Sequence, residues 1–586
     1  MTVNRETAQL LERVAAVFRV KEGDTFRVKA YLNAAAVIDS LTEPLDELWR
    51  QQKLDTVPGL GKALVGYLQE YFSKGKVQHF DSQLKKVPAG MFALMDIRGV
   101  GPMTAYKLAR KFHLSDKKTA IHRLQQLIKD DKLGKIESFK ERSIERLTKS
   151  LKIQTIGKGR LLLSDALSIA EDYLEYLKRS SLTIEAEPLG SLRRRLSTVG
   201  DIDLALNTKH PEASMKHALS YSQISSVITK GDKVSHVKLK NGFEVDIKIS
   251  EPRDWGSLLQ HYTGSKMHNI HLRTIAKGKN LSLSEYGIKK GKKTNHFKTE
   301  KDCYRFLGMQ VIPPELREDT GEIGLAQKNS LPELIELGDI KGDLHIHSNY
   351  DFPSSHDQGV SSLHEILTKA EELGYEYIGI SDHNPKYSGL SEKETEKILM
   401  GRKKFLEQDF HAYEKRVKNR GIKLLIGMEI DIRPDGDLAL SDKLMNSLDY
   451  AIVSIHSSFD KGMDENTDRI INALSHPKAL ILGHPTGRLI NRRDPIVADW
   501  EKIFEFSAKS KKIIEVNSYP DRLDLPDDLI KTAVSKGVKL IINTDSHDVD
   551  HMDGIKYGVW QARRGYATKK DIVNSLTWKN LQTVLK

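Results

Sequence analysis

The spacing of apolar residues changes twice along the chain and divides it into three regions. Up to about residue 154, apolar residues recur at a period typical of amphipathic helices. From 155 to 320, alternating apolar and polar runs, typical of half-buried strands, are mixed with helical segments. From 341 onward, continuous apolar runs alternate with helical segments, which predicts a parallel sheet covered by helices. The chain is therefore expected to hold several domains, as its 586 residues also indicate.

One predicted strand of the middle region carries two carboxylates on the same face. Side chains alternate between faces along a strand, so Asp201 and Asp203 share one face and the opposite face is apolar. A bare Asp-x-Asp is more often solvated, but paired carboxylates with an apolar face behind them suit hard divalent cations. Asp246 lies in another β-rich run and is the expected third ligand, because adjacent strands commonly supply carboxylates to one metal site.

A turn rich in glycine and arginine comes just before these carboxylates. Gly190 and Ser191 lead into the run Arg193–Arg195, and Gly200 closes a short polar turn before Asp201. Backbone N–H groups and guanidinium groups in such a turn can bind a triphosphate. Together, the turn and the carboxylates predict metal-assisted nucleotidyl transfer.

Two similar turns in the helical region favour binding to a nucleic-acid backbone. Their glycines let backbone amides approach a phosphate, and the helix that follows adds its dipole. Such helix-hairpin-helix units hold the DNA backbone without reading bases. A third helical segment, 124–151, lacks the Gly-x-Gly turn and is interpreted as a degenerate or structural unit. The residues expected to contact DNA are Gly59, Gly61, Lys62, Gly99 and Gly101.

Composition narrows the class of protein. A net charge of +12 and a pI near 9.2 favour a polyanionic partner. The single cysteine, Cys303, excludes intramolecular disulfides and suits a reducing cytoplasm. The N-terminal segment is charged and amphipathic, unlike a signal peptide, and no run of about eighteen apolar residues predicts a transmembrane helix. We therefore expect a cytoplasmic protein that does not enter a membrane.

In the C-terminal region, seven apolar runs each end in residue types that commonly bind metals. One histidine after a strand is more often structural, but seven such runs in succession are not expected by chance. Residues at the carboxyl ends of parallel strands meet on one rim of a β/α barrel, where they would form one site. Histidine and carboxylate ligands suit a cluster of two or three Mn²⁺, Zn²⁺ or Fe ions, which could clamp a phosphodiester and activate water. The residues at these ends are His345, His347, Asp382, His383, Glu429, His456, His484, Glu515, Asn517, Asp545 and His547.

The motifs of the middle region resemble those of the nucleotidyltransferase superfamily and, within it, of the X-family DNA polymerases. The resemblance implies that Asp201, Asp203 and Asp246 are catalytic and hold two Mg²⁺ or Mn²⁺ ions at the polymerase site. It also assigns the upstream turn to the phosphates of a dNTP, through Gly190, Ser191, Arg194 and Gly200.

Further along the chain, the run Thr263–Ser265 resembles a motif in the thumb of these polymerases. The family usually has Tyr-Phe before this motif, whereas this chain has His261 and Tyr262, so the contacts near the ribose are altered. By position, Asn269 and Arg273 are expected to face the minor groove of the nascent base pair and the template. The resemblance thus adds to the nucleotide site the residues His261, Tyr262, Gly264, Asn269 and Arg273.

The C-terminal region resembles the polymerase-and-histidinol-phosphatase (PHP) family, which is found fused behind X-family polymerases in bacteria and some archaea. The resemblance implies that Asp382 orients His383 or its neighbours. The family usually has an Asp or His shortly after the His-x-His motif; here Asp351, His356 and Asp357 compete in a longer loop, and distance from the motif favours Asp351. The implied metal ligands are His345, His347, Asp351, His383, Glu429, His456, His484, Asp545 and His547.

Together, the resemblances cover nearly the whole chain and imply a multidomain protein. In some X-family members a lysine of the first domain acts as a lyase; the matching residue here is Tyr67, so lyase activity by this mechanism is not expected. The expected domains are an all-α helix-hairpin-helix DNA-end-binding domain at 1–85, a fingers-like helical domain at 86–154, an α/β nucleotidyltransferase palm at 155–253, a thumb at 254–320, a linker at 321–340 and a distorted (β/α)7 PHP barrel at 341–586.

The expected function is a family X DNA polymerase that fills short gaps in base-excision-type repair, with a metal-dependent 3′-5′ exonuclease or 3′-end-processing activity in the PHP domain. The expected partners are gapped or primer-template DNA and dNTPs, and the chain is expected to act as a monomer. One alternative is a template-independent nucleotidyltransferase with a fused phosphoesterase, against which the tandem hairpins and the thumb motif argue. Another is a DNA-binding repair scaffold with both sites inactive, against which the complete carboxylate and histidine sets argue.

Overall fold

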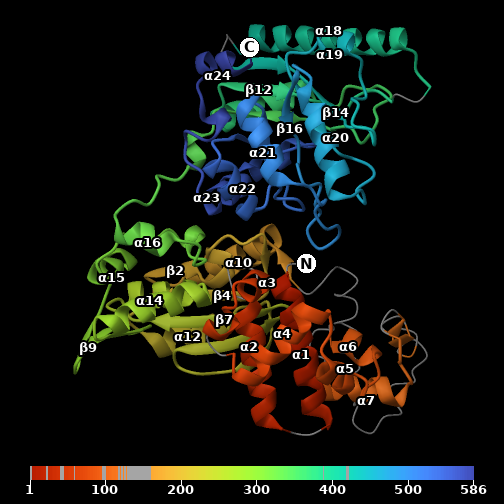
Figure 1. Cartoon of the computed structure of the whole chain (residues 1–586). Coiled ribbons are helices and arrows are strands. Elements are labelled where there is room, and N and C mark those ends of the chain that lie inside the picture. The colour runs from red at the N-terminus through yellow and green to blue at the C-terminus, as the bar shows by residue number, and fades with distance from the viewer. Residues whose placement is uncertain are drawn as a thin grey trace. The chain divides into compact units, whose positions relative to one another are not determined.

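A computed structural model divides the chain into two compact units, residues 1–159 and 160–586. In Figure 1 the first unit shows helices, whereas the second combines helices with strands, in line with the three sequence regions. Most of the third helical segment expected at 124–151 lies outside the described residues. The structure describes residues 3–21, 24–39, 45–57, 60–95, 101–116, 119–120, 123–124, 127, 160–386, 389–417 and 421–585.

The helices of the first unit pack around two apolar clusters that share α1 (Val3–Lys21). Leu11 and Phe18 of this helix belong to one cluster, and Val17 belongs to the other. Because both sides of α1 are buried, its apolar residues recur at the helical period seen in the sequence. The other helices whose bounds are described are α2 (Thr25–Asp39), α3 (Leu45–Arg50), η1 (Leu54–Thr56), α4 (Lys62–Lys74), α5 (Gln78–Leu84), α6 (Gly90–Met95) and α7 (Pro102–Lys111).

A five-stranded mixed sheet forms the first part of the second unit, in the order β2-β4-β7-β6-β5. β4 and β7 are parallel, and the other neighbours are antiparallel. The hairpin predicted from Asn241–Gly242 joins β6 to β7. Helix α10 packs against β2 and β4 and shares their apolar cluster. The elements are β1 (Leu161–Leu162), α10 (Leu163–Lys178), β2 (Glu185–Pro188), α11 (Gly190–Arg193), β3 (Thr198–Val199), β4 (Ile202–Asn207), α12 (Pro211–Leu219), β5 (Ile224–Thr229), β6 (Val234–Leu239) and β7 (Glu244–Ser250), and β1 pairs with β3 outside the five-stranded sheet.

The segment after this sheet folds around an apolar cluster of its own. Three short antiparallel strands, in the order β10-β9-β8, lie between its helices along the chain. Ser265 accepts a hydrogen bond from the backbone N–H of His268 and so caps the start of α14. The elements are α13 (Trp255–Thr263), α14 (Lys266–Gly278), β8 (Leu281–Ser284), β9 (Gly287–Lys290), β10 (Lys293–Asn295), α15 (Glu300–Phe306), η3 (Pro314–Leu316) and α16 (Glu322–Gln327).

Two parallel sheets build the C-terminal region, in the orders β11-β12-β13 and β14-β15-β16-β17-β18. Only Gly427 separates β13 from β14 along the chain. Bridges between His383 and Glu429 and between Ile346 and Ser546 join the two sheets. Because the strands are parallel, their carboxyl ends meet on one side. The strands are β11 (Gly342–Ile346), β12 (Tyr377–Ile380), β13 (Lys423–Ile426), β14 (Met428–Asp431), β15 (Ala451–Ser454), β16 (Ala479–Leu482), β17 (Ile513–Asn517) and β18 (Lys539–Asn543).

Apolar side chains on both faces of these strands are buried, as the continuous apolar runs predicted. One cluster lies between the strands and the surrounding helices, and a second gathers residues such as Leu344 and Tyr450. The hydroxyl of Tyr450 donates a hydrogen bond to the carbonyl of Leu344 at 2.6 Å. Figure 1 shows helices flanking the strands; they are α17 (Leu363–Glu372), α18 (Glu392–Arg416), α19 (Asp442–Met445), α20 (Met463–Ser475), α21 (Trp500–Lys509), α22 (Asp527–Ser535), α23 (Ile555–Arg564) and α24 (Trp578–Leu585).

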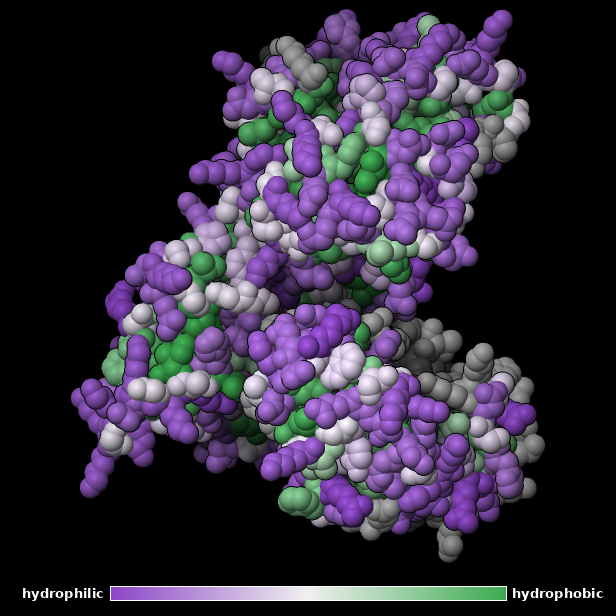
Figure 2. All heavy atoms as spheres, viewed as in Figure 1, coloured by the Kyte–Doolittle hydropathy of each residue, from purple (hydrophilic) through white to green (hydrophobic). Residues whose placement is uncertain are grey.

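The surface is dominated by polar and charged side chains. Figure 2 shows hydrophilic residues over most of the visible face, in keeping with a chain of which 29% is charged. Among the described helices, none combines the length and the apolar character that a membrane span requires.

One fully buried arginine ties the segment after the mixed sheet to the glycine-arginine turn. Arg317 Nη1 lies 2.5 Å from Oε1 of Glu300, and Arg193 donates to the other oxygen of that carboxylate at 2.7 Å. A buried charge is costly unless it is paired, so this carboxylate is needed where it stands. Burial alone would raise the pKa of Glu300, but the two guanidinium groups outweigh burial and lower the pKa to about 2.

Replacing Glu300 by glutamine should destabilise the second unit by about 3–5 kcal/mol at neutral pH, because Arg317 would stay buried without a countercharge. Since the pKa of Glu300 is lowered, its contribution is present above the pKa of the unfolded chain and is lost as pH falls toward about 2. The stability difference between variant and native chain should therefore shrink on acidification. Thermal denaturation of the full chain across this pH range measures both effects.

Asp302→Asn is the matched control, because it removes the partly exposed partner of Arg305 on the same helix. Such a pair contributes no more than about 1 kcal/mol. Equal destabilisation by the two substitutions would contradict the role assigned to the buried carboxylate.

Candidate active sites

Asp203 and Asp246 face each other across the parallel pair β4–β7. Their Cα positions are direct partners in the strand register, so the two predicted carboxylates lie side by side. Asp201 is exposed and stands just before β4 begins at Ile202. Ile202 itself is buried in the apolar cluster behind the sheet, which leaves the carboxylates on the opposite face. The structure thus brings together the three acidic residues expected from the sequence.

Two basic side chains pair with these carboxylates. Lys248, on β7, forms an ion pair with Asp203, and its Nζ lies 3.1 Å from Oδ2 of Asp246. His236, on β6, pairs with Asp246 through Nδ1. Burial raises the pKa of Asp203 although Lys248 opposes it, whereas His236 and Lys248 outweigh burial and lower the pKa of Asp246. Sequence reasoning missed Lys248, although its place two residues after Asp246 on the same strand is a period-two signal.

The glycine-arginine turn approaches these carboxylates closely. Gly190 has a φ of +57°, and a β-carbon there would lie 2.5 Å from Oδ2 of Asp203. Only glycine allows this approach, because other residues would clash and rarely adopt a positive φ. Ser191 follows in α11, and Gly200 lies next to the guanidinium of Arg160, at the end of the turn. The four phosphate-binding candidates of the turn therefore lie in one segment that contacts the carboxylates.

Arg194 connects the turn to the segment that follows α13. Its Nε donates to Oε1 of Glu318 at 2.9 Å, and its Nη1 donates to the carbonyl of Thr263 at 2.6 Å. Gly264 has a positive φ and packs against the same guanidinium. Arg194 and the neighbouring Arg193 are therefore both ion-paired in this structure, Arg193 with Glu300 and Arg194 with Glu318.

The remaining nucleotide-site candidates lie on α13 and α14. The rings of His261 and Tyr262 meet edge to face at 4.7 Å, and the ring of Tyr262 lies 5.0 Å from Nζ of Lys248. The side-chain amide of Asn269 donates to the carbonyl of His261 at 2.6 Å and holds the two helices together. Burial lowers the pKa of His261, so its ring is neutral at pH 7. Arg273 is exposed on α14 and free to meet a ligand outside the fold.

In the first unit, the described DNA-contact candidates lie at helix starts. Gly61 precedes α4, Lys62 is its first residue and exposed, and Gly101 precedes α7. The other two candidates, Gly59 and Gly99, lie outside the described residues. Tyr67, at the position of the family's lyase lysine, stacks on His79 with ring centroids 4.9 Å apart. A phenol provides no amine for a Schiff base, so the absence of lyase activity by this mechanism stays a prediction.

Glu429, on β14, is the centre of a cluster of histidines and carboxylates at the carboxyl ends of the parallel strands. The side chain is fully buried. Its Oε2 lies 3.2 Å from Nε2 of His345 and 3.0 Å from Nδ1 of His383. Its Oε1 lies 3.3 Å from Nε2 of His456 and 2.8 Å from Nε2 of His484. One carboxylate therefore faces two pairs of imidazole rings, an arrangement suited to a ligand that bridges metals.

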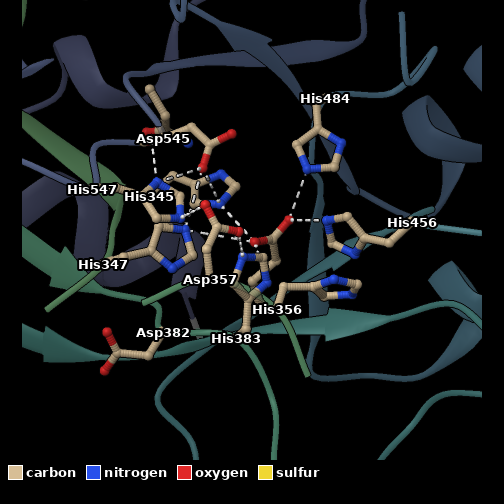
Figure 3. A network of polar contacts seen from close by, with 12 residues as sticks. His345, His347, His356, Asp357, Asp382, His383, His456, His484, Asp545 and His547 are labelled. Atoms are coloured by element: carbon tan, nitrogen blue, oxygen red, sulfur yellow. Dashed lines mark hydrogen bonds and ion pairs between the residues drawn. The ribbon is translucent and has the colours of Figure 1, made fainter. Parts of the chain in front are cut away.

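The ring nitrogens of this cluster fit metal ions. Nε2 atoms of His345, His347 and His547 are buried and lie 3.2 to 3.5 Å from carboxylate oxygens without forming a well-directed hydrogen bond, an arrangement that a shared metal ion would satisfy. Figure 3 shows the labelled histidines converging on one space, with Asp545 beside them. Within the described part of the chain, four groups have ligand atoms within 4.8 Å of one another: His347, His383 and His547; His345, His347, Glu429 and Asp545; His356, Asp431 and His456; and His383, Glu429 and His456.

Two further carboxylates fix the orientation of these rings. Oε1 of Glu515 lies 2.7 Å from Nδ1 of His345, and its Oε2 accepts the backbone N–H of His484 at 2.6 Å. Oδ1 of Asp431 lies 2.7 Å from Nδ1 of His456. A partner on one ring nitrogen fixes the tautomer and directs the other nitrogen to a metal. The sequence marks Glu515 only as a strand-end residue and gives no motif for Asp431, although Asp431 lies two residues after Glu429 and so on the same face of the strand.

Asp382 acts on the neighbours of the cluster. Figure 3 shows its side chain directed away from the histidines. It accepts hydrogen bonds from the backbone N–H of Ser348 at 2.5 Å and from Nε of Arg402 at 2.6 Å. Arg402 also donates to two carbonyls at the ends of β12 and β13. Asp382 therefore positions the residue after His347, and its expected role toward His383 stays a prediction.

The loop after β11 places the three candidates for the extra ligand at different distances from the cluster. Asp351, the favoured extra ligand, is exposed and belongs to none of the four groups. His356 instead lies 2.9 Å from Oδ1 of Asp431, through Nε2. Asp357 is largely exposed and reaches within 3.5 Å of Nε2 of His547. Because the loop folds back on itself, proximity in sequence to the His-x-His motif did not indicate which side chain returns to the cluster.

Three family models match separate stretches of the chain. The helix-hairpin-helix domain matches residues 2–77, the DNA polymerase beta thumb matches 258–318, and the PHP domain matches 343–519. The first stretch holds the Gly61 turn, the second holds Thr263–Ser265, and the third holds most of the histidine cluster.

Named relatives extend this similarity. DNA polymerase lambda of Arabidopsis thaliana is 24% identical over 355 residues, or 54% of this chain and 62% of that protein. A probable phosphatase of Clostridium acetobutylicum is 30% identical over 214 residues, or 35% of this chain and 78% of that protein. The DNA polymerase/3′-5′ exonuclease PolX of Bacillus subtilis (strain 168) is 32% identical over 586 residues, which span 99% of both chains. The chain therefore belongs to the PolX family, in which a family X DNA polymerase is followed by a C-terminal PHP domain.

Proposed function

We propose that the chain is a DNA-directed DNA polymerase that fills short gaps during base-excision-type repair and also removes nucleotides from 3′ ends. The observation that carries the proposal is the presence of two separate clusters of metal-ligand residue types in one chain. One joins Asp203 and Asp246 in direct register beside a phosphate-binding turn. The other gathers histidines around Glu429. The carboxylate site suits nucleotidyl transfer, and the histidine site suits phosphodiester hydrolysis.

The domain layout proposed from the sequence fits these sites. The mixed sheet would be the palm at 155–253, followed by a thumb at 254–320 and a linker at 321–340. The parallel strands at 341–586 would close into a distorted (β/α)7 barrel, with β13 and β14 counted as one bent strand. The bridges from His383 to Glu429 and from Ile346 to Ser546 support closure. The helical domains would occupy 1–85 and 86–154.

At the polymerase site, Asp201, Asp203 and Asp246 would hold two Mg²⁺ or Mn²⁺ ions. When bound, such ions lower the pKa of the primer 3′-OH and neutralise the triphosphate and the leaving pyrophosphate. Ser191 and Arg194 would bind the β,γ-phosphates, and the glycines of the turn would let its backbone approach them. Tyr262 and Asn269 would line the pocket for the incoming dNTP.

At the PHP site, the histidines, Glu429 and Asp545 would hold two or three divalent ions, of which Mn²⁺, Zn²⁺ and Fe suit the ligand set. When bound, these ions activate water and stabilise the charge that develops on the phosphodiester. Glu429 would be the central ligand, and Glu515 and Asp431 would keep the histidine rings oriented. His356, in place of Asp351, would complete the group that also contains Asp431 and His456.

DNA and dNTPs are the proposed partners, and the chain is proposed to act as a cytoplasmic monomer. The net charge of +12 and the hairpin turns support DNA as the substrate. The tandem hairpins and the thumb favour a templated DNA polymerase over a template-independent nucleotidyltransferase. Primer extension with and without a template strand separates these two functions.

Asp203→Ala should abolish nucleotide incorporation and leave DNA binding unchanged. The substitution removes a carboxylate that faces both Asp246 and the phosphate-binding turn, so a loss of roughly 10²–10³-fold or more is expected. Extension of a labelled primer on a gapped duplex measures incorporation, and a gel shift measures binding. Asp172→Ala, which removes an exposed carboxylate from α10, is the control and should retain activity. Incorporation by a pure Asp203→Ala preparation would refute the assignment.

His356→Ala should lower the amount of Mn²⁺ bound and slow 3′-5′ degradation by about 10–100-fold, because it removes a member of the third metal group. Asp351→Ala, in the same loop, should change neither quantity. Elemental analysis of the purified variants and digestion of a 5′-labelled single strand provide the measurements. The reverse pattern would show that the sequence-based choice of Asp351 was right.

A further inference from the structure

Helix α23 of the C-terminal region contacts the phosphate-binding turn directly. Arg564, at the end of this helix, donates from Nη1 to the carbonyl of Arg194 at 2.9 Å and to Oε1 of Glu318 at 3.1 Å. Its Nη2 donates to Asp527 at 2.5 Å, which anchors the guanidinium in the C-terminal region. Only 7% of its side chain is exposed, so these contacts replace water. The turn is thus bonded to a residue of the other half of the molecule.

A second contact from the same helix holds the next residue of the turn. The guanidinium of Arg195 stacks on the ring of Trp560 at 4.0 Å. Nη1 of Arg195 is buried without a hydrogen-bond partner, so the indole face is its main neighbour on that side. Arg195 also has a φ of +59°, which residues other than glycine rarely adopt. The stack therefore stabilises a backbone conformation that the turn would not keep readily by itself.

The far end of the turn is also tied to the C-terminal region. The side-chain amide of Asn491 donates to the carbonyl of Arg160 at 3.0 Å. Arg160 in turn donates to the carbonyl and the hydroxyl of Thr198, three residues before Asp201. Leu523, which follows β17, is buried in the apolar cluster of the mixed sheet. Contacts from the C-terminal region therefore bracket the segment that runs from the phosphate-binding turn to the catalytic strand.

We propose that the PHP domain is a positioning element of the polymerase site, in which Trp560 and Arg564 hold the phosphate-binding turn in the conformation that binds the dNTP. This inference rests on the proposed function of the turn. Glu318 is central, because its Oε1 is shared between Arg194 and Arg564. Without Arg564, Glu318 would pair with Arg194 alone and compete more strongly with a triphosphate. The effect should fall on dNTP binding, since neither residue contacts the carboxylates.

Steady-state gap filling by the full chain tests the role of the stack. Trp560→Ala should raise KM for the dNTP about 3- to 30-fold, the range expected for loss of a partly buried cation–π contact, and leave kcat within about 2-fold. Trp560→Phe keeps an aromatic face and should restore KM to near the native value. Lys556→Ala, which removes a charge from the same helix, is the control and should behave like the native chain. Degradation of a 5′-labelled single strand without dNTPs should be equal in all four proteins.

Arg564→Ala provides a second variant and should raise KM at least as much as Trp560→Ala. A normal KM in both variants would overturn the inference. So would a parallel loss of kcat and of nuclease activity, because that pattern indicates a merely structural interface. If Arg564→Ala does not fold, Trp560→Ala and Trp560→Phe still decide. Failure of the native chain itself to incorporate templated dNTPs would instead refute the proposed function.

Discussion

A buried carboxylate shared among imidazole rings is the interaction on which the C-terminal half depends. Glu429 is inaccessible to water, and four histidines from other strand ends lie within 3.3 Å of its oxygens. An unpaired charge at this depth would cost several kcal/mol, so the strands must end together for the fold to be stable. Arg402 helps by bonding the carbonyls of Ile380 and Gly427, next to two of the strand ends that carry ligands. The same contacts therefore hold the strand ends together and gather the residues that are proposed to bind metal ions.

At the polymerase site, carboxylate charges are also compensated by basic side chains, but the site is less buried. Asp203 and Asp246 are brought together by strand register, and Lys248 and His236 compensate them from the same sheet. Its acidic residues are carboxylates alone, a residue type that suits hard ions such as Mg²⁺, whereas a histidine-rich set suits softer ones. Two sites with different preferences allow one chain to carry two opposed chemistries. The contacts of α23 with the turn indicate that the two halves are not independent.

Much of this arrangement follows from local sequence patterns. The pairing of Asp203 with Asp246, the Asn-Gly hairpin and the gathering of histidines and carboxylates at strand ends each follow from a local pattern, and the structure shows all three. What could not be predicted depends on long-range packing. The choice of His356 over Asp351 follows from how a loop folds back, and the contact of Arg564 with Arg194 joins residues 370 positions apart. Lys248 and Asp431 each lie two residues after a predicted site residue on the same strand, so they could have been placed on the same face. Neither belongs to a recognisable motif.

The central claim is that synthesis and degradation of the same 3′ end occur at separate sites. The most direct measurement incubates a 5′-labelled gapped duplex with Mn²⁺, with and without dNTPs, using the full chain and its His345→Ala, His347→Ala double variant. The native chain should lengthen the primer with dNTPs and shorten it without them. The double variant should lengthen it as well as the native chain does and fail to shorten it. Persistent shortening, or a matching loss of extension, would contradict the account.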